Sequence, residues 1–195
     1  MNRNPNHPKP GSSILAEPIR CQMAIKSIKK LLKNEPRNHC LFTMGINTNF
    51  KAKELLQLKV KMVKNKKPGD VIEVLDTRSG KTKSVILNKS CIKVLQKLMD
   101  TKHLADDDYL FSGPKGALKL PSLNRLVKQW CHSVNLIGNY GTHSLRKTFG
   151  YQQGVQYGVA LPTLMKTFNH STKKETLRYL GMKNEQIKSI FENEI

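Results

Sequence analysis

Four side chains in the last third of the sequence could act together on an anion. His143 and Arg146 stand three positions apart, so a helix over this segment would place both on one face. A guanidinium and an imidazole on one face favour a negatively charged target. Further along, His170 precedes a predicted helix that opens with the T-x-x-E spacing of a capping box, and Tyr179 comes two turns into that helix.

Taken singly, these side chains have ordinary structural explanations. A histidine near a helix start is more often a cap or a core residue than a catalyst, and a tyrosine in a helix more often packs. Their order and spacing are more informative. The string H-x-L-R-K-T from His143 to Thr148, followed by H-S-x-x-x-x-T-x-x-Y-L from His170 to Leu180, resembles the C-terminal half of the tyrosine recombinase (phage integrase) family.

The upstream half of the chain resembles the same family, with departures. The segment MGINTNFKAKELLQLKV is similar to the family pattern T-G-L-R-x-x-E-L-L-x-L. In that register the family's first catalytic arginine falls on Lys51, and the glycine two positions before it falls on Asn49. The string T-R-S-G-K resembles the family's K-T-G-K turn, so Arg78 takes the catalytic lysine position, with Lys81 and Lys83 close enough to substitute.

The resemblance implies a defined reaction on DNA. Tyr179 would attack a phosphodiester in line, expel the 5′-hydroxyl and form a 3′-phosphotyrosyl link, with no metal or nucleotide cofactor. The transition state gathers negative charge on the non-bridging oxygens, and the resemblance implies that Arg146, His170 and Lys51 stabilise that charge. These residues are therefore the first candidates for the catalytic site.

Proton transfer and the two departures from the family pattern bear on activity. His143 would assist proton transfer from the tyrosine or position it. A lysine near Arg78 would protonate the leaving oxygen, because an arginine with a pKa above about 12 is a poor acid. Lys51 keeps the positive charge but lacks the planar fork of arginine. The sequence thus predicts either a slow site-specific recombinase or an inactive DNA-binding relic.

The H-x-L-R motif and the short chain disfavour a type IB topoisomerase, which resembles the family at its active site.

The chain is strongly basic. Among its 195 residues, 34 lysines and arginines stand against 14 aspartates and glutamates, which gives a formal charge of +20. This charge is typical of a protein that binds a phosphate backbone, although an anionic membrane surface or simple solvation of the fold would also fit. Double-stranded DNA is the predicted partner, and the resemblance implies dimers and tetramers on it. The lysines predicted to contact DNA are Lys26, Lys29, Lys30, Lys33, Lys83, Lys147, Lys173 and Lys174.

The pattern of apolar residues predicts the elements that would position these side chains. They form an α+β fold that is mainly α-helical. Two β-rich runs, 71–75 and 83–87, flank a turn and predict an antiparallel hairpin. Residues 109–111 could add an edge strand and make a three-stranded sheet. Apolar residues recur at helical spacing through most other segments. The helices predicted near the candidate site lie around 143–151, 161–168 and 172–180.

The domain organisation follows from composition. Residues 1–13 are polar and proline-rich and predict a flexible arm before a catalytic domain over 14–195, without the N-terminal core-binding domain of ordinary family members. The segment from about 184 forms either a last helix packed in its own chain or, as the resemblance implies, a tail that docks on a neighbouring protomer. The sequence has no apolar run of about 18 residues and no signal-peptide core, which predicts a soluble protein of the bacterial cytoplasm or nucleoid.

Neither the acidic residues nor the cysteines predict a metal site. The run Asp106-Asp107-Asp108 could bind a cation, but without further spaced ligands it is typical of a solvated turn. The four cysteines are scattered without a C-x-x-C pair, which argues against a zinc ribbon and a disulfide framework.

Overall fold

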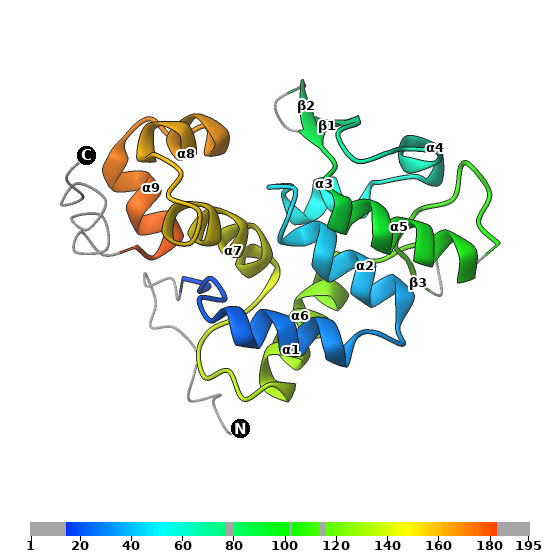
Figure 1. Cartoon of the computed structure of the whole chain (residues 1–195), viewed down its shortest axis with the longest axis horizontal. Helices are drawn as coiled ribbons and strands as arrows, with labels where there is room; N and C mark the ends of the chain where they lie inside the picture. The colour runs from blue at the N-terminus through cyan, green and yellow to red at the C-terminus, as the bar shows by residue number, and fades with distance from the viewer. Residues whose placement is uncertain (1–14, 77–79, 102, 114–115, 183–195) are drawn as a thin grey trace, which may run out of the picture.

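The structure is a computed structural model that describes residues 15–76, 80–101, 103–113 and 116–182. Helices dominate these residues, as the sequence predicts. In chain order the elements are α1 (Gln22–Leu31), α2 (Pro36–Gly45), α3 (Ala52–Leu56), α4 (Val60–Val63), β1 (Val71–Asp76), β2 (Lys81–Ile86), α5 (Lys89–Thr101), β3 (Ser112–Gly113), β4 (Gly116–Ala117), α6 (Leu120–Ser133), α7 (Thr142–Val155), α8 (Leu161–Phe168) and α9 (Lys173–Leu180). In Figure 1, α7, α8 and α9 lie together at one end, α5 lies toward the other, and the β1–β2 hairpin stands at the upper edge between them.

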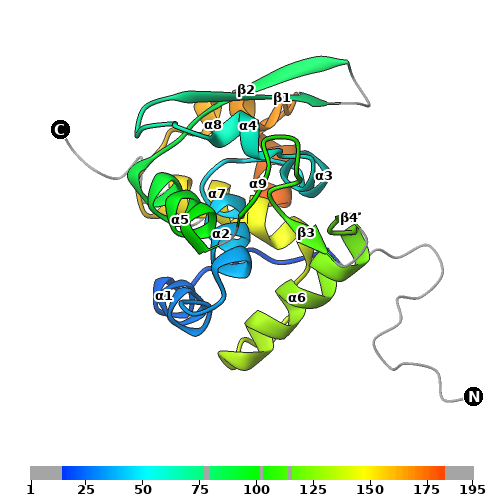
Figure 2. The same ribbon diagram turned by 90° about the vertical axis from the view of Figure 1, so that its right-hand side faces the viewer.

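The predicted hairpin is confirmed. Strands β1 and β2 pair antiparallel, with Val71 opposite Ile86 and Asp76 opposite Lys81. Ile72 and Val74 on β1 are 2% and 3% exposed, so one face of the hairpin packs on the core while the other faces solvent. In Figure 2 the hairpin runs along one edge of the molecule, above α3 and α4.

The predicted edge strand at 109–111 is wrong. Tyr109 forms an isolated bridge with Lys59, and the amide of Leu110 donates to the carbonyl oxygen of Leu58 at 2.8 Å. Leu110 and Phe111 are buried in the main core, so tertiary packing holds this segment beside the α3–α4 connection and away from the hairpin. The described strands form two separate two-stranded sheets, β1–β2 and β3–β4.

The buried apolar residues form two clusters. The larger cluster runs from Ile19 to Leu145 and includes an edge-to-face contact between Phe42 and Trp130, with ring centroids 5.9 Å apart. The smaller cluster lies under α8 and α9. Its buried members are Tyr151, Leu164, Phe168, Leu180 and Met182. Helix α7 contributes to both clusters and therefore connects them.

Gly150 allows the close packing of α7 against α8 and α9. A Cβ atom added at this position would lie 2.5 Å from a methyl group of Leu180 and 2.6 Å from the ring of Phe168. Any larger residue would therefore push apart the helices that carry the candidate site.

Three sequence-based predictions fall outside the described residues. They concern the arm over 1–13, the segment from about 184 and the residue Arg78.

Candidate active site

Helix α7 places His143 and Arg146 on one face, as their spacing predicts. The start of the helix is held by the amide of Gly141, which donates to Ser144 Oγ at 3.0 Å, and the amide of Thr142, which donates to Asn124 Oδ1 at 3.1 Å. Both His143 and Arg146 line a cavity of about 620 Å³, here called the Arg146 cavity. Other residues on its wall are Lys51, Asp76, Asn124 and Tyr179.

The turn between α8 and α9 brings His170 to Tyr179. Their ring centroids are 5.1 Å apart and the rings lie at 72°. His170 Nδ1 also lies 3.0 Å from Thr176 Oγ1, which fixes the imidazole against the first turn of α9. Burial is the first cause of a lowered pKa for His170, and the Arg146 guanidinium lowers it further while Glu175 opposes the shift.

The predicted Thr172 cap at the start of α9 is confirmed, whereas Glu175 accepts from Ser171 and not, as in a full capping box, from the amide of Thr172. Thr172 Oγ1 accepts from the amide of Glu175 at 3.1 Å, and the Glu175 carboxylate accepts from the amide of Ser171 at 3.0 Å. These bonds satisfy backbone donors that have no partner within the helix. They fix the end of α9 that adjoins His170.

Arg146 on α7 contacts aromatic rings on both α8 and α9. Its guanidinium carbon lies 4.9 Å from the ring centroid of Phe168 and 5.9 Å from that of Tyr179. His143 lines the Arg146 cavity with Tyr179 and also lines a second cavity of about 620 Å³ that contains Tyr179. The structure therefore brings His143, Arg146, His170 and Tyr179 together from separate segments.

The hydroxyl of Tyr179 is buried without a hydrogen-bond partner among the described residues. Burial raises the pKa of this phenol, and the nearby Arg146 guanidinium opposes that shift. The ammonium of Lys147 lies 4.9 Å from the centroid of the Tyr179 ring, on which it forms a cation–π contact. In this conformation the Tyr179 oxygen is covered by neighbouring atoms.

Lys51 lies where the resemblance to the family places an arginine, and it lines the Arg146 cavity. It is the N-cap of α3, and its amide donates to Glu54 Oε2 at 2.7 Å. Its ammonium pairs with Asp76 Oδ2 at 2.5 Å and lies 3.8 Å from Glu54 Oε1. Lys51 is thus a cation at the Arg146 cavity whose charge is partly balanced by two carboxylates.

The two described hairpin lysines have different surroundings. Lys81 is exposed at the start of β2. Lys83 instead points inward, where its ammonium donates to the carbonyl oxygen of Asn49 and lies 3.5 Å from Glu54 Oε2. Burial, followed by the charge of Arg146, lowers the pKa of Lys83 to about 8, although Glu54 opposes the shift. Lys83 was predicted to contact DNA; its side chain is 23% exposed, and its ammonium is bound to the carbonyl oxygen of Asn49.

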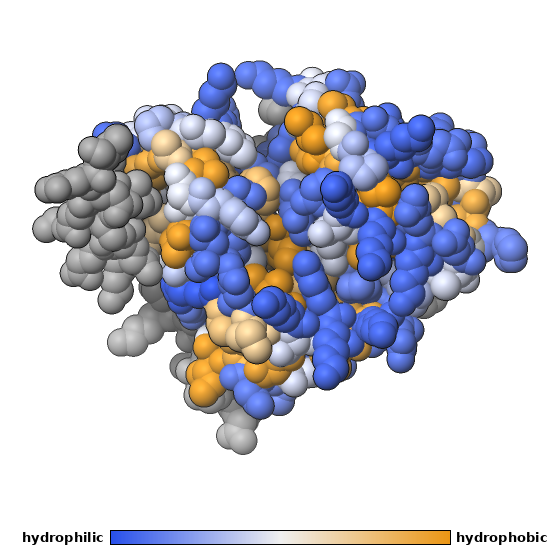
Figure 3. All heavy atoms as spheres, viewed as in Figure 1, coloured by the Kyte–Doolittle hydropathy of each residue, from blue (hydrophilic) through white to orange (hydrophobic). Residues whose placement is uncertain are grey.

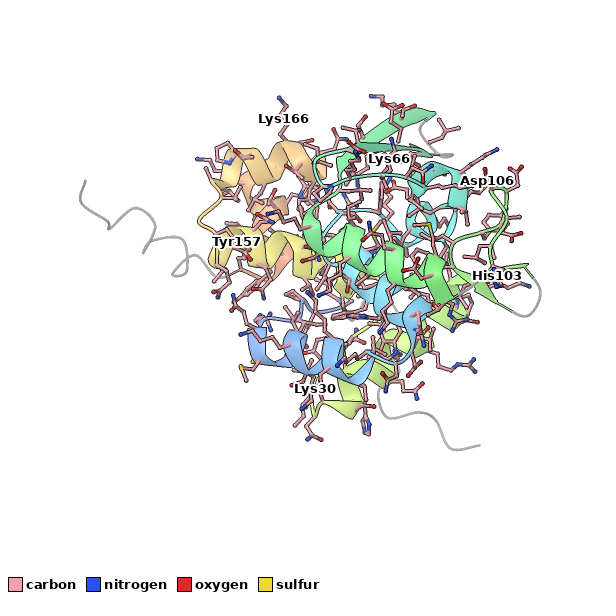
Figure 4. All side chains as sticks on the ribbon, turned by 45° about the vertical axis from the view of Figure 1, so that its right-hand side comes forward. Lys30, Lys66, His103, Asp106, Tyr157 and Lys166 are labelled. Atoms are coloured by element: carbon pink, nitrogen blue, oxygen red, sulfur yellow. The ribbon has the colours of Figure 1, made fainter. Side chains whose placement is uncertain are left out.

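The other lysines predicted to contact DNA are spread over several surfaces. Lys26 and Lys30 are exposed on α1, Lys33 is exposed in the turn that follows it, and Lys29 is half-buried. Figure 4 shows Lys30 at the edge of the molecule opposite Lys166 of α8. Lys26 and Lys29 line a separate cavity of about 210 Å³ beside α7, away from the Arg146 cavity. Hydrophilic residues cover much of the face seen in Figure 3, which agrees with the charge of the chain.

Near Tyr179 the predicted lysines divide into buried and exposed groups. Lys147 is 4% exposed, and burial is the main cause of its lowered pKa. This burial does not fit the predicted phosphate contact, because the side chain packs on Tyr179. Lys173 and Lys174 are exposed at the start of α9, and Lys174 lines the second cavity with Tyr179.

Sequence reasoning did not assign a role to two residues beside the site. Asn49 Oδ1 accepts from Arg146 Nε at 2.8 Å, and Asp76 pairs with Lys51. The departure of Asn49 from the family glycine was a usable signal, because it introduces an amide two positions before Lys51, where the resemblance places a catalytic arginine. For Asp76 the only signal of a role at the site was its position directly after the predicted strand 71–75.

The described residues give no sign of a metal cluster or a membrane span. No group of three His, Cys, Asp or Glu side chains among them is arranged to hold a metal ion. In the acidic run, Asp106 pairs with Lys64 at 2.7 Å and Asp107 pairs with Lys61 at 2.7 Å. None of the described helices has both the length and the apolar character needed to cross a membrane.

Comparison with known proteins identifies relatives over most of the chain. The family model described as the phage integrase family matches residues 22–186. The chain is 27% identical over 180 residues to the probable integrase/recombinase YoeC of Bacillus subtilis (strain 168), covering 91% of this chain and 96% of the relative. It is 24% identical over 176 residues to the tyrosine recombinase XerC of Caldanaerobacter subterraneus, covering 85% of this chain and about half, 48%, of that relative.

Solved structures share the fold. The XerA recombinase superposes with a TM-score of 0.73 at 17% identity, over 92% of this chain and 65% of that one. The XerH recombinase, in a post-cleavage complex with its palindromic difH substrate, superposes with a TM-score of 0.71 at 20% identity, over 92% of this chain and 53% of that one. The chain therefore spans roughly half to two thirds of these proteins.

Proposed function

This chain belongs to the phage integrase family, and we propose that it is a site-specific tyrosine recombinase or integrase domain that cleaves and rejoins DNA through Tyr179. The observation that carries the proposal is the convergence of Arg146, His143 and Tyr179 on one cavity, with His170 packed against the tyrosine ring. His143 and Arg146 come from α7, Tyr179 comes from α9, and His170 comes from the turn before α9. Their meeting beside an arginine supports a site that acts on an anionic phosphodiester.

In the proposed reaction, Tyr179 Oη forms a bond to phosphorus while the bond from phosphorus to the 5′-oxygen breaks. The product is a 3′-phosphotyrosyl ester and a free 5′-hydroxyl, and attack of that hydroxyl on the ester reverses the step. Because one phosphate ester replaces another, the reaction needs no external energy source. The phenol proton leaves with the help of His143, and the departing 5′-oxygen takes a proton from a lysine.

The cations around the cavity would stabilise the transition state. Arg146 can donate two parallel hydrogen bonds to non-bridging oxygens, and His170 can donate a further bond after Tyr179 moves. Lys51 would supply the remaining charge, after release from Asp76. Lys81, Lys83 and Arg78 are the candidates on the hairpin for the proton donor.

A catalytically weak DNA-binding relic is the second candidate. Two observations favour it: Lys51 replaces the forked donor of the family pattern and pairs with Asp76, and the hydroxyl of Tyr179 is buried. Either function would place the protein on double-stranded DNA in the bacterial cytoplasm or nucleoid. We propose dimers and tetramers on DNA for the active form, with the catalytic domain extending over 14–195.

A covalent capture experiment separates the two candidates. The full chain is incubated with a pool of randomised duplexes, each nicked so that cleavage releases a short fragment and traps the protein on DNA. An active recombinase gives a covalent adduct that is absent in Tyr179→Phe and retained in Tyr157→Phe, a control at an exposed tyrosine. DNA binding without any adduct would support the relic and contradict the recombinase.

A further inference from the structure

Asn49 contacts three elements of the proposed site. It lies in the connection between α2 and α3, is 3% exposed, and has a φ of 52°. This left-handed conformation is common for glycine and tolerated by asparagine, because the short amide adds little steric conflict. The family pattern has glycine at this position. The chain therefore meets the backbone requirement there with a residue that also carries a donor and an acceptor.

Both polar atoms of the Asn49 side chain are used. Oδ1 accepts from Arg146 Nε on α7 at 2.8 Å, and Nδ2 donates to the carbonyl oxygen of Thr167 on α8 at 2.8 Å. The main-chain oxygen of Asn49 accepts from the ammonium of Lys83 on β2. One buried residue thus joins the arginine, the helix that precedes His170 and the inward-facing lysine.

The bond to Nε determines which atoms of Arg146 remain available. A guanidinium has five N–H donors in a rigid plane, and holding Nε leaves the two terminal nitrogens for a substrate. Asn49 fixes one edge of that plane, and the ring of Phe168 lies 4.9 Å from the guanidinium carbon. Two contacts in different directions restrict rotation of the group about its last bonds.

We infer that Asn49 is a positioning residue that orients the Arg146 guanidinium toward the scissile phosphate. The inference rests on the proposed function, because it requires Arg146 to contact that phosphate. Among the described residues that line the Arg146 cavity, Arg146 is the one arginine, while Lys51 takes the place of the other family arginine. A site with one forked donor depends strongly on how that donor is held, since misplacement by about 1 Å can lower a rate by about 100-fold.

The first test measures the hydrogen bond without activity. In NMR spectra of the full chain, we expect the Nε–H of Arg146, assigned with Arg146→Lys, to exchange slowly with solvent. Asn49→Gly keeps the left-handed backbone but removes the acceptor, so exchange should quicken at least about tenfold. Asn49→Asp retains the acceptor and should preserve slow exchange, as should Asn135→Gly, a control at an exposed left-handed asparagine. Unchanged exchange in Asn49→Gly, or fast exchange in Asn49→Asp, would overturn the inference.

The second test asks whether orientation matters for cleavage. In single-turnover reactions on the captured nicked duplex, Asn49→Gly should lower the cleavage rate by about 10-fold to 100-fold, with DNA affinity changed by less than about twofold. In an Arg146→Lys background the same substitution should have little effect, because lysine has no Nε–H to hold. An equal rate loss in both backgrounds would assign Asn49 a structural role only. Absence of any adduct in the unmodified protein would refute the proposed function, while the NMR result would still test the contact.

Discussion

At the residue scale, the charge of Lys51 is shared between the cavity and the protein. Its ammonium contacts Asp76 and lies near Glu54, so a phosphate must compete with two carboxylates for it. Lysine presents a single point charge, whereas arginine can bond one carboxylate and still direct further N–H groups at a phosphate. The identity of residue 51 should therefore affect the chemical step more than the stability of the fold.

Lys51→Arg is predicted to raise the rate of covalent adduct formation by at least about tenfold, because it restores a planar donor to the transition state. The rate is measured in single-turnover reactions on nicked duplex. Lys61→Arg, an exposed position on α4 that pairs with Asp107, serves as the matched control. A gain below tenfold, or the same gain in the control, would contradict the role given to Lys51.

The pKa of Lys83 predicts a pH dependence of stability. Burial and the charge of Arg146 lower this pKa to about 8 from an ordinary value of 10.5. Below pH 8 the folded and unfolded states both hold the proton, whereas between pH 8 and 10.5 only the unfolded state does. Because the unfolded state then binds more protons, raising the pH through this window increases the free energy of unfolding. Lys83 therefore stabilises the fold more at pH 10 than at pH 8.

Urea denaturation of the unmodified chain and of Lys83→Met measures this contribution. The difference in unfolding free energy, unmodified minus variant, should increase between pH 8 and pH 10. Subtracting the variant removes the titration of other groups that both proteins share. A difference that stays level or falls over this range would show that the ammonium is not held in the buried position.

The sequence could identify the catalytic candidates at this scale but not their contacts. The structure brings His143, Arg146, His170 and Tyr179 together because their spacing follows a pattern that a shared fold imposes. The contact that Lys83 makes could not be predicted, since strand alternation alone does not reveal that its ammonium reaches the carbonyl oxygen of a residue 34 positions away. Burial by distant segments is a property of the tertiary structure.

At the scale of elements, α9 is short and depends on its cap. The helix has eight residues, and isolated helices of that length are not stable in water. Its stability therefore comes from packing on the smaller apolar cluster and from the capping bonds of Thr172 and Glu175. Because α9 carries Tyr179, the order of its first turn bears on the position of the proposed nucleophile.

Thr172→Ala is predicted to lower the free energy of unfolding by about 1 kcal/mol, since it removes the acceptor for a helix N-terminal amide. Hydrogen exchange at the amides of α9 should quicken more than exchange at those of α5, which packs in the larger cluster. Thr172→Ser keeps the hydroxyl and should retain most of the stability. If alanine and serine have the same effect, the cap does not hold α9.

Features set by neighbouring residues could be predicted from the sequence, whereas contacts between distant segments could not. The Thr172 cap and the hairpin are encoded within a few residues, and the structure has both as predicted. The segment 109–111 has strand-like residues, but its backbone pairs with the α3–α4 connection because Leu110 and Phe111 are buried there. A sequence pattern indicates that a segment is extended without saying which partner it finds.

At the scale of the whole molecule, the proposed site lies between two apolar clusters. Lys51 and Lys83 belong to elements packed on the larger cluster, whereas His170 and Tyr179 adjoin the smaller one. Helix α7 spans both clusters and carries Arg146.

The charge of +20 is distributed over several faces, so the surface that meets DNA must be located by experiment. Lys173 and Lys174 are exposed at the start of α9, and Lys174 lines the second cavity with Tyr179. DNA positioned for attack by Tyr179 would pass close to them. The sequence-based prediction that the α1 lysines also contact DNA remains a prediction, since Lys26 and Lys29 line a different cavity.

The salt dependence of binding tests this placement. The log of the DNA-binding constant falls as the log of the salt concentration rises, and each phosphate contact adds about 0.9 to the magnitude of that slope. Lys173→Gln with Lys174→Gln should therefore lower the magnitude of the slope by about 1.8. A labelled duplex of arbitrary sequence suffices, because phosphate contacts do not depend on sequence. The matched control removes the same charge at Lys89 and Lys93, which are exposed on α5. It should leave the slope unchanged. An equal reduction in both pairs would mean that DNA is held by diffuse charge, and no reduction for the α9 pair would place DNA on another face.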